Sequence, residues 1–286
     1  MPVPDIVGKS WDDFLKDFKK DWEPGQHVAI VAPTGQGKTT VLVSLLNECR
    51  SYVLGFDPKG GDDTLAKTGY PRLTQWPPPS RDYDKMAGRA SPEWRDVWRW
   101  LTRQPPRTVD RQPVKYLVGP KTRRRRDRPS LIAMQERALE GAWDDGGWTV
   151  AIDELQIAAD KMGQKDSIDE LLIAARTRKV SVVSLFQRPA NVPRAAYEMA
   201  SHIFLGLTLD VDTINRLSEI VGRPKYEIRG AVNGLASADY SWLIVPNNPR
   251  RPILLTLPRE PDVQPKSNSR NRSETAVTSP VVGSAG

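Results

Sequence analysis

The chain has 286 residues, 38% of them hydrophobic and 27% charged, and a formal net charge of +7. This length and composition indicate a globular protein of one large or two small domains that can bury a substantial core. The single cysteine, Cys49, excludes an internal disulfide, and two histidines argue against a histidine-based triad or zinc site.

No stretch of about 18 apolar residues and no apolar N-terminal leader can be found in the sequence. We therefore expect a soluble protein in the reducing environment of the cytoplasm. Positive charge is concentrated in residues 81–128, which contain fifteen Lys and Arg against six Asp and Glu. Such a segment favours a polyanionic partner, although an ordinary solvated basic surface has the same composition.

Residues 9–22 are predicted to form an amphipathic helix. Ser10 is a suitable N-cap, with Asp13 three residues later, and Pro24-Gly25 ends the segment. Its apolar residues share one face: Trp11, Phe14, Leu15, Phe18 and Trp22. We expect this face to pack on the rest of the protein; docking of a partner is the alternative.

Residues 27–40 have the strand, loop and helix order of a phosphate-binding loop. Glycines at 35 and 37 allow backbone N–H groups to turn toward phosphate oxygens, and the following helix directs its positive end at them. The first glycine of the usual pattern is replaced by Ala32. The predicted nucleotide-binding residues are Pro33, Thr34, Gly35, Gln36, Gly37, Lys38, Thr39 and Thr40, with the Lys38 ammonium for the β- and γ-phosphates and the Thr39 hydroxyl for Mg²⁺.

Further strands and helices alternate along the chain. Apolar runs predict strands at 51–57, 114–118, 148–152, 180–186, 202–207, 242–245 and 253–256, and periodic segments predict helices at 91–101, 129–141, 167–178, 194–199 and 211–221. The basic run Arg123, Arg124, Arg125 and Arg126 falls in a loop between a strand and a helix. This order indicates an α/β fold with a mostly parallel sheet covered on both faces.

Polar residues follow several of the predicted strands. Asp57, Asp153, Glu154 and Gln187 each stand where a strand ends, as the phosphate loop does. Because the carboxyl ends of parallel strands meet at one edge, we expect these residues to converge on a ligand site. Asp153 suits Mg²⁺ binding, Glu154 the attacking water, and Gln187 the γ-phosphate or that water; two solvated carboxylates are the alternative for the Asp-Glu pair.

Four sequence elements together resemble the FtsK/HerA superfamily of hexameric DNA-pumping ATPases. They are the phosphate loop, Phe56-Asp-Pro-Lys-Gly60, Ile152-Asp-Glu154 and Leu185-Phe-Gln-Arg-Pro189. The resemblance covers about residues 26–256 and implies a RecA-like (ASCE) P-loop core with Glu154 as catalytic glutamate and Gln187 as sensor. It also implies that an arginine completes the neighbouring subunit's site; Arg176 and Arg178 are the candidates, and an arginine-rich helix end at the surface is the alternative.

We therefore expect an N-terminal helix in residues 1–24, an ATPase domain in 25–259 with a basic, Trp-rich insertion at about 71–129, and a disordered tail at 260–286. The expected activity is ATP hydrolysis with Mg²⁺ by a ring, typically a hexamer, that moves double-stranded DNA in viral genome packaging or plasmid transfer. A capsid or membrane partner is compatible with this function. Candidate DNA contacts are Arg123 to Arg126 and, in the loop expected after Glu154, Lys161 and Lys165.

Two other classes of function fit parts of the pattern. A small-molecule P-loop kinase would transfer phosphate to an acceptor without responding to DNA; the carboxylate Glu154 directly after Asp153 argues for hydrolysis by water instead. A nucleotide-dependent scaffold would hydrolyse ATP slowly and would keep its biological activity after Glu154→Gln.

Overall fold

The computed structural model describes residues 6–49, 51–58, 63–77, 115–119, 128–187, 193–208, 211–235, 241–247 and 251–256. The predicted helix at 91–101, the basic run Arg123–Arg126 and the predicted disordered tail lie outside these residues.

The described strands form one ten-stranded sheet in the order β1-β10-β9-β8-β2-β7-β6-β3-β5-β4. Neighbouring strands are parallel except β9, which is antiparallel to both β8 and β10. The strands are β1 (Ile6–Gly8), β2 (His27–Val31), β3 (Tyr52–Phe56), β4 (Arg72–Leu73), β5 (Lys115–Val118), β6 (Trp148–Ile152), β7 (Ser181–Phe186), β8 (Ala200–Leu205), β9 (Trp242–Pro246) and β10 (Ile253–Thr256). The predicted mostly parallel α/β sheet is confirmed.

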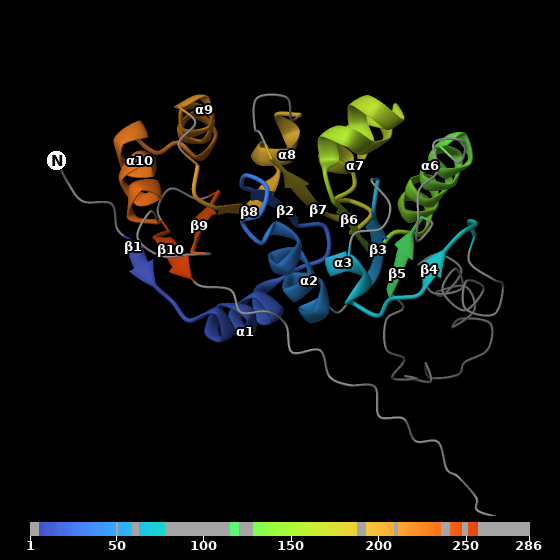
Figure 1. Cartoon of the computed structure of the whole chain (residues 1–286), viewed down its shortest axis with the longest axis horizontal. Coiled ribbons are helices and arrows are strands. Elements are labelled where there is room, and N and C mark those ends of the chain that lie inside the picture. The colour runs from blue at the N-terminus through green and yellow to red at the C-terminus, as the bar shows by residue number, and fades with distance from the viewer. Residues whose placement is uncertain are drawn as a thin grey trace, which may run out of the picture.

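Helices cover both faces of this sheet (Figure 1). On one face lie α1 (Trp11–Asp21), α2 (Lys38–Glu48) and α3 (Asp63–Ala66), and on the other lie α6 (Arg128–Asp145), α7 (Lys165–Ala174), α8 (Ala195–Glu198), α9 (Val211–Val221) and α10 (Lys225–Gly234). All residues of β2, β6 and β7 are buried because both faces are covered. Along β2, Val28 and Ile30 pack with the α1 and α2 side chains, while Ala29 and Val31 pack with the opposite layer.

The N-terminal segment is built into this architecture. Strand β1 pairs with β10, and the Ser10 hydroxyl caps α1 by accepting the Asp13 N–H at 3.1 Å. Phe14 is 3% exposed, and its ring centroid lies 5.6 Å from that of Phe204 on β8. The predicted apolar face of α1 therefore lies against the core.

Two local predictions are wrong. The helix expected to reach Arg178 ends at Ala174, because the backbone turns back and both Arg178 N and Val180 N donate to the Ala175 carbonyl at 3.0 Å. The segment after Glu154, expected to be a loop, is instead a π-helical turn, η2 (Ile157–Lys161), followed at once by α7.

Candidate nucleotide site

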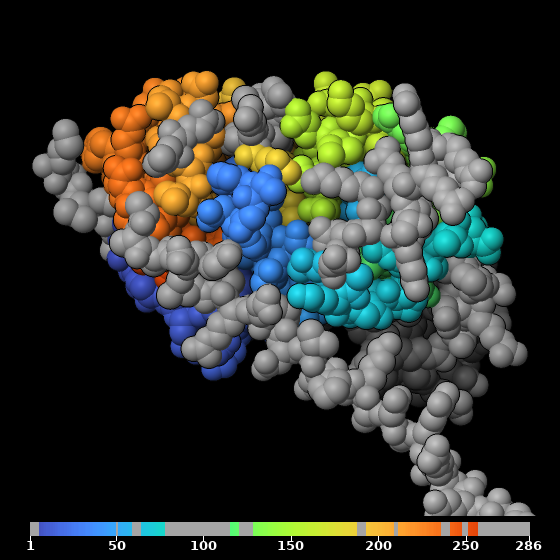
Figure 2. Space-filling model, in the orientation of Figure 1, coloured from blue at the N-terminus to red at the C-terminus, as the bar shows by residue number. Residues whose placement is uncertain are grey.

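The phosphate loop joins the carboxyl end of β2 to the start of α2. Gly35 and Gly37 have φ values of 85° and 77°, left-handed conformations that L-amino acids with a side chain avoid. Gly37 is also the N-cap of α2, so the loop passes directly into the positive end of this helix. In the space-filling view, the blue surface of this region lies near the middle of the face, between the cyan α3 region and the orange α9 and α10 (Figure 2).

The Lys38 ammonium is held inside the loop. This side chain is only 7% exposed, and its Nζ donates to the carbonyl oxygens of Ala32 and Pro33, each at 2.8 Å. Buried ammonium groups need such partners, and both carbonyls belong to the loop that would surround a phosphate. The geometry places a positive charge at the base of the loop.

Ala32 stands where the usual pattern has glycine, and it packs closely against the strand end beside it. Ala32 is fully buried, and a Cβ added to Gly206, just after β8, would lie 2.7 Å from the Ala32 Cβ. The phosphate loop therefore begins in a narrow space between the carboxyl ends of β2 and β8.

Strands β2, β7, β6 and β3 are consecutive in the sheet, so the residues after their carboxyl ends are brought together. Asp153 follows β6, is 4% exposed, and donates its N–H to the Phe56 carbonyl at 3.1 Å. Because side chains alternate along a strand and Ala151 packs with the α2 layer, Asp153 belongs on the α2 side of the sheet. Thr39 in the first turn of α2 and Asp153 can thus approach one ligand.

Glu154 makes the junction between β6 and η2. Its φ of 59° is left-handed, and its carbonyl accepts the N–H groups of Ile157 at 2.8 Å and Ala158 at 3.3 Å. Its carboxylate Oε1 accepts a hydrogen bond from Nε2 of Gln187, which follows β7. The two residues with predicted catalytic and sensor roles are in direct contact.

The sequence did not predict that Arg72 lies beside this edge, where it pairs with Asp57. Asp57 after β3 is fully buried, and the Arg72 guanidinium of β4 lies 3.4 Å from its carboxylate. Arg72 reaches Asp57 from two strands away in the sheet, and no spacing in the sequence indicates such a pair. A guanidinium this close compensates the burial of the carboxylate beside the candidate site.

Arg176 and Arg178 lie at the opposite edge. Their backbone carbonyls are close to Gly25 before β2 and Gly146 before β6, at the amino ends of the strands, and the Gly147 N–H donates to the Arg178 carbonyl at 3.0 Å. Both side chains are exposed, and the Arg178 guanidinium lies 5.8 Å from the centre of the Trp143 ring. Neither arginine is brought to the phosphate loop of its own chain.

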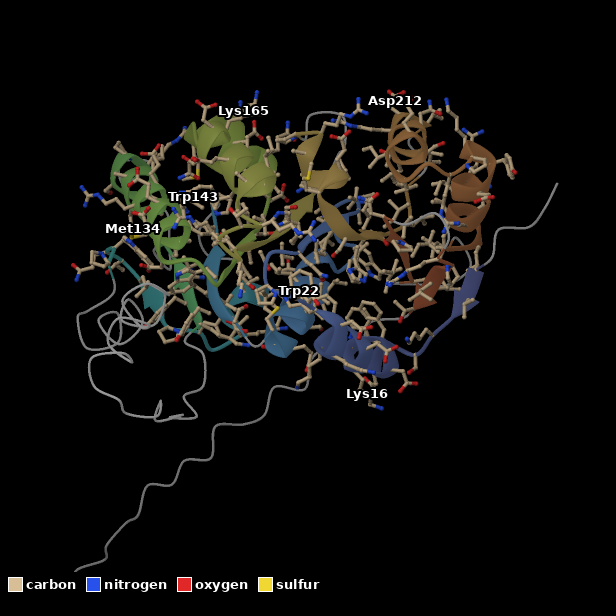
Figure 3. The ribbon with its side chains drawn as sticks, turned by 180° about the vertical axis from the view of Figure 1, so that it is seen from behind. Lys16, Trp22, Met134, Trp143, Lys165 and Asp212 are labelled. Carbon is tan, nitrogen blue, oxygen red and sulfur yellow. The ribbon has the colours of Figure 1, made fainter. Side chains whose placement is uncertain are left out.

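The lysines predicted to contact DNA lie on the same edge as the phosphate loop. Lys161 ends η2 and Lys165 begins α7, and both are exposed. Lys165 stands at the outer border of the molecule in the view from behind (Figure 3).

The histidines and the cysteine are structural. Burial lowers the pKa of both His27 and His202 to about 4, and burial raises the pKa of Cys49 to about 11. The His27 Nδ1 accepts the Val182 N–H at 2.9 Å, so this ring links β2 to β7 in its neutral form. Among the described residues, no group of three or more His, Cys, Asp and Glu could by itself hold a metal.

The fold and the loop together define a P-loop protein with a RecA-like α/β core. No protein-family model matches the chain, and a comparison with curated proteins finds no match. In the described residues, no helix has the length and apolar character needed to cross a membrane.

Solved structures are similar in fold. The genome-packaging NTPase B204 of Sulfolobus turreted icosahedral virus 2, in complex with sulfate, has 15% identity and a TM-score of 0.52, with 83% of this chain and 98% of that chain covered. The same NTPase with AMPPCP has 17% identity and a TM-score of 0.50, covering 83% and 100% of the two chains. The bacterial conjugative coupling protein TrwBdeltaN70 has 15% identity and a TM-score of 0.50, covering 85% and 88%. At these identities the likeness shows a shared fold.

Proposed function

We propose that the chain is a Mg²⁺-dependent ATPase. The observation that carries this proposal is the meeting of the phosphate loop, Asp153, Glu154 and Gln187 at the carboxyl ends of neighbouring parallel strands. Lys38 and the left-handed glycines bind the phosphates, and Glu154 orients the attacking water and accepts its proton.

The Thr39 hydroxyl and the Asp153 carboxylate would hold the metal. Both are hard oxygen donors, which Mg²⁺ prefers, and both belong to the α2 side of the carboxyl edge. Bound Mg²⁺ neutralises charge that develops on the phosphates.

We further propose that this ATPase works as a homo-oligomeric ring, typically a hexamer, that moves double-stranded DNA in genome packaging or plasmid transfer. Three observations support this: a fold shared with a packaging NTPase and a coupling protein, the basic segment 81–128, and exposed lysines at 161 and 165 beside the nucleotide edge. Phosphate contacts by lysine and arginine hold DNA of any sequence, which suits a motor that moves along it.

The test is steady-state ATP hydrolysis by the purified protein with and without long double-stranded DNA, together with its size in ATP and Mg²⁺. We expect DNA to stimulate hydrolysis in a ring-sized species, and both Lys38→Ala and Glu154→Gln to abolish it. Glu170→Gln, which removes an exposed carboxylate from α7, is the matched control and should behave as the wild type. Hydrolysis by a monomer that ignores DNA would contradict the motor. Phosphate transfer to a small acceptor would indicate a kinase. Slow hydrolysis, with a biological activity that survives Glu154→Gln, would indicate a scaffold.

A further inference from the structure

The contact between Gln187 and Glu154 occupies the carboxylate that hydrolysis needs. Strands β6 and β7 are neighbours, and the pairing of Ile152 with Ser184 places Glu154 level with Phe186, one residue before Gln187. From this position the Gln187 Nε2 donates to Glu154 Oε1. A carboxylate oxygen that already accepts this bond is less available to a water molecule on the same side.

The backbone of Glu154 is held in place, so a response to nucleotide would come from its side chain. Its carbonyl accepts two N–H groups of η2, and its left-handed φ is set by the sharp passage from strand to helix. A non-glycine residue persists in this conformation only where the surrounding structure imposes it. The carboxylate can therefore change partner by rotating its side chain, while the main chain stays in place.

The loop lysine is arranged in a similar way. The Lys38 Nζ donates to two carbonyls of its own loop, so phosphate oxygens would exchange with these acceptors. Two functional side chains of the site are thus bonded to protein groups that a nucleotide would replace.

We propose that Gln187 is a positioning residue that latches Glu154 until a γ-phosphate is present. The γ-phosphate takes the Gln187 N–H, and the released Glu154 carboxylate then accepts the hydrogen bond of the attacking water. This inference rests on the proposed ATPase function and adds to it a reason why Glu154 acts only when the nucleotide is ATP.

The latch predicts that Glu154 opposes γ-phosphate binding through Gln187. Breaking the bond costs free energy when ATP binds and costs nothing when ADP binds, since ADP leaves the latch closed. Removing the Glu154 carboxylate should strengthen binding of AMPPCP about tenfold relative to ADP, the lower end of the contribution of a hydrogen bond to a charged group.

The experiment measures dissociation constants for Mg²⁺-AMPPCP and Mg²⁺-ADP in a double-mutant cycle of Glu154→Gly and Gln187→Ala. Glycine tolerates the left-handed backbone at 154, so the variant keeps its fold, and a thermal melt of each variant verifies this. Glu154→Gln, which retains an oxygen acceptor, should give a smaller gain than Glu154→Gly. Gln156→Ala, at a half-buried glutamine two residues beyond Glu154, is the matched control and should bind both nucleotides as the wild type does.

We expect the gain from Glu154→Gly to vanish in the Gln187→Ala background. A gain that persists there would show simple repulsion between the carboxylate and the γ-phosphate and would overturn the latch while leaving the ATP site intact. A Glu154→Gly variant with no gain would also overturn the latch. Failure of the wild type to bind either nucleotide would overturn the proposed function itself.

Discussion

Glu154 combines a predicted catalytic role with a backbone conformation that suits glycine. The left-handed conformation costs an L-residue about 1–2 kcal/mol, and the structure bears this cost at the residue that would orient the attacking water. Strain stored in this way is expected at a functional site, where the direction of one side chain matters more than local stability.

This conformation distinguishes two substitutions. We expect Glu154→Gly to be about 1 kcal/mol more stable than Glu154→Ala, because alanine keeps the left-handed penalty and glycine does not. Both should lose ATP hydrolysis. Urea unfolding of the two variants measures the difference, and an alanine variant at least as stable as the glycine variant would show that φ at 154 relaxes in solution.

His27 gives the protein a pH-dependent stability. Burial lowers its pKa to about 4, helped by the nearby Arg176 charge and opposed by a backbone hydrogen bond to Leu172. Since the unfolded state binds the proton near pH 6.5 and the folded state only near 4, stability should fall as the pH decreases from 6.5 to 4, by about 3 kcal/mol for this group. Above pH 6.5 the contribution should be constant.

The variant His27→Asn tests this assignment. Its side-chain oxygen can accept the Val182 N–H that the His27 Nδ1 accepts now, but it cannot titrate. Urea unfolding at pH 5 and pH 7.5 should show a smaller loss of stability in the variant than in the wild type. An equal loss would assign the pH dependence to other groups, His202 first among them.

At the scale of elements, α1 stabilises the face of the sheet that carries the phosphate loop. Its buried aromatic side chains pack beside α2 and against Phe204 of β8. Phe14→Ala should therefore cost about 3 kcal/mol in unfolding free energy, as truncation of a buried phenylalanine does. Lys16→Ala, on the outer side of α1 (Figure 3), should change it by less than about 0.5 kcal/mol. Chemical denaturation measures both changes, and an equal loss of unfolding free energy in the two variants would mean that α1 does not dock as described.

Most elements that build the site could be predicted because burial on both faces makes their strands continuous apolar runs. Strands β2, β6 and β7 are buried at every position, and α9 has the predicted bounds of Val211 to Val221. The short strands β1 and β4 were missed because they contain three and two residues, too few for a pattern. Helix α10 was also missed, although Ile228, Ala231, Val232 and Leu235 have helical spacing; Gly230 and Gly234 weaken that pattern.

The parts of the site that escaped prediction depend on tertiary structure. At the end of α7, the local hydrogen bonds to the Ala175 carbonyl are joined by one from a distant segment, in which the Gly147 N–H donates to the Arg178 carbonyl. The meeting of the strand ends could be inferred from the expected parallel sheet. The hydrogen bond from Gln187 to Glu154 could not, because it also involves the left-handed backbone at 154, and a glutamate in the sequence does not indicate that conformation.

The whole molecule has two chemically different edges. The carboxyl edge carries the phosphate loop, Glu154 and, beyond η2, the exposed Lys161 and Lys165. We expect the double variant Lys161→Gln and Lys165→Gln to weaken DNA binding and to reduce the slope of log affinity against log salt by about 0.9 for each lost phosphate contact. Fluorescence anisotropy with duplexes of two unrelated sequences measures this, with Lys16→Gln on α1 as the control; an unchanged slope would exclude these lysines from the DNA path.

The amino edge carries Arg176 and Arg178, whereas the phosphate loop of the same chain lies at the carboxyl ends of the strands. If either arginine stabilises the transferring phosphoryl group, it must therefore do so in another copy of the chain. We expect Arg176→Ala or Arg178→Ala to reduce hydrolysis by about 10³ to 10⁵, the range for arginine fingers. Lys179→Gln, which removes an exposed cation from the same turn, should have little effect.

Mixing two inactive variants separates action between subunits from a local structural effect. In a mixed ring, a Glu154→Gln subunit can offer its intact arginine to the intact nucleotide site of an Arg176→Ala neighbour, so part of the activity should return. The recovered rate should rise and then fall as the mixing ratio is varied, because only junctions between unlike subunits are complete. If no ratio restores hydrolysis although both variants enter the same ring, the arginines act by shaping their own subunit, and the turn after α7 is a structural element of the amino edge.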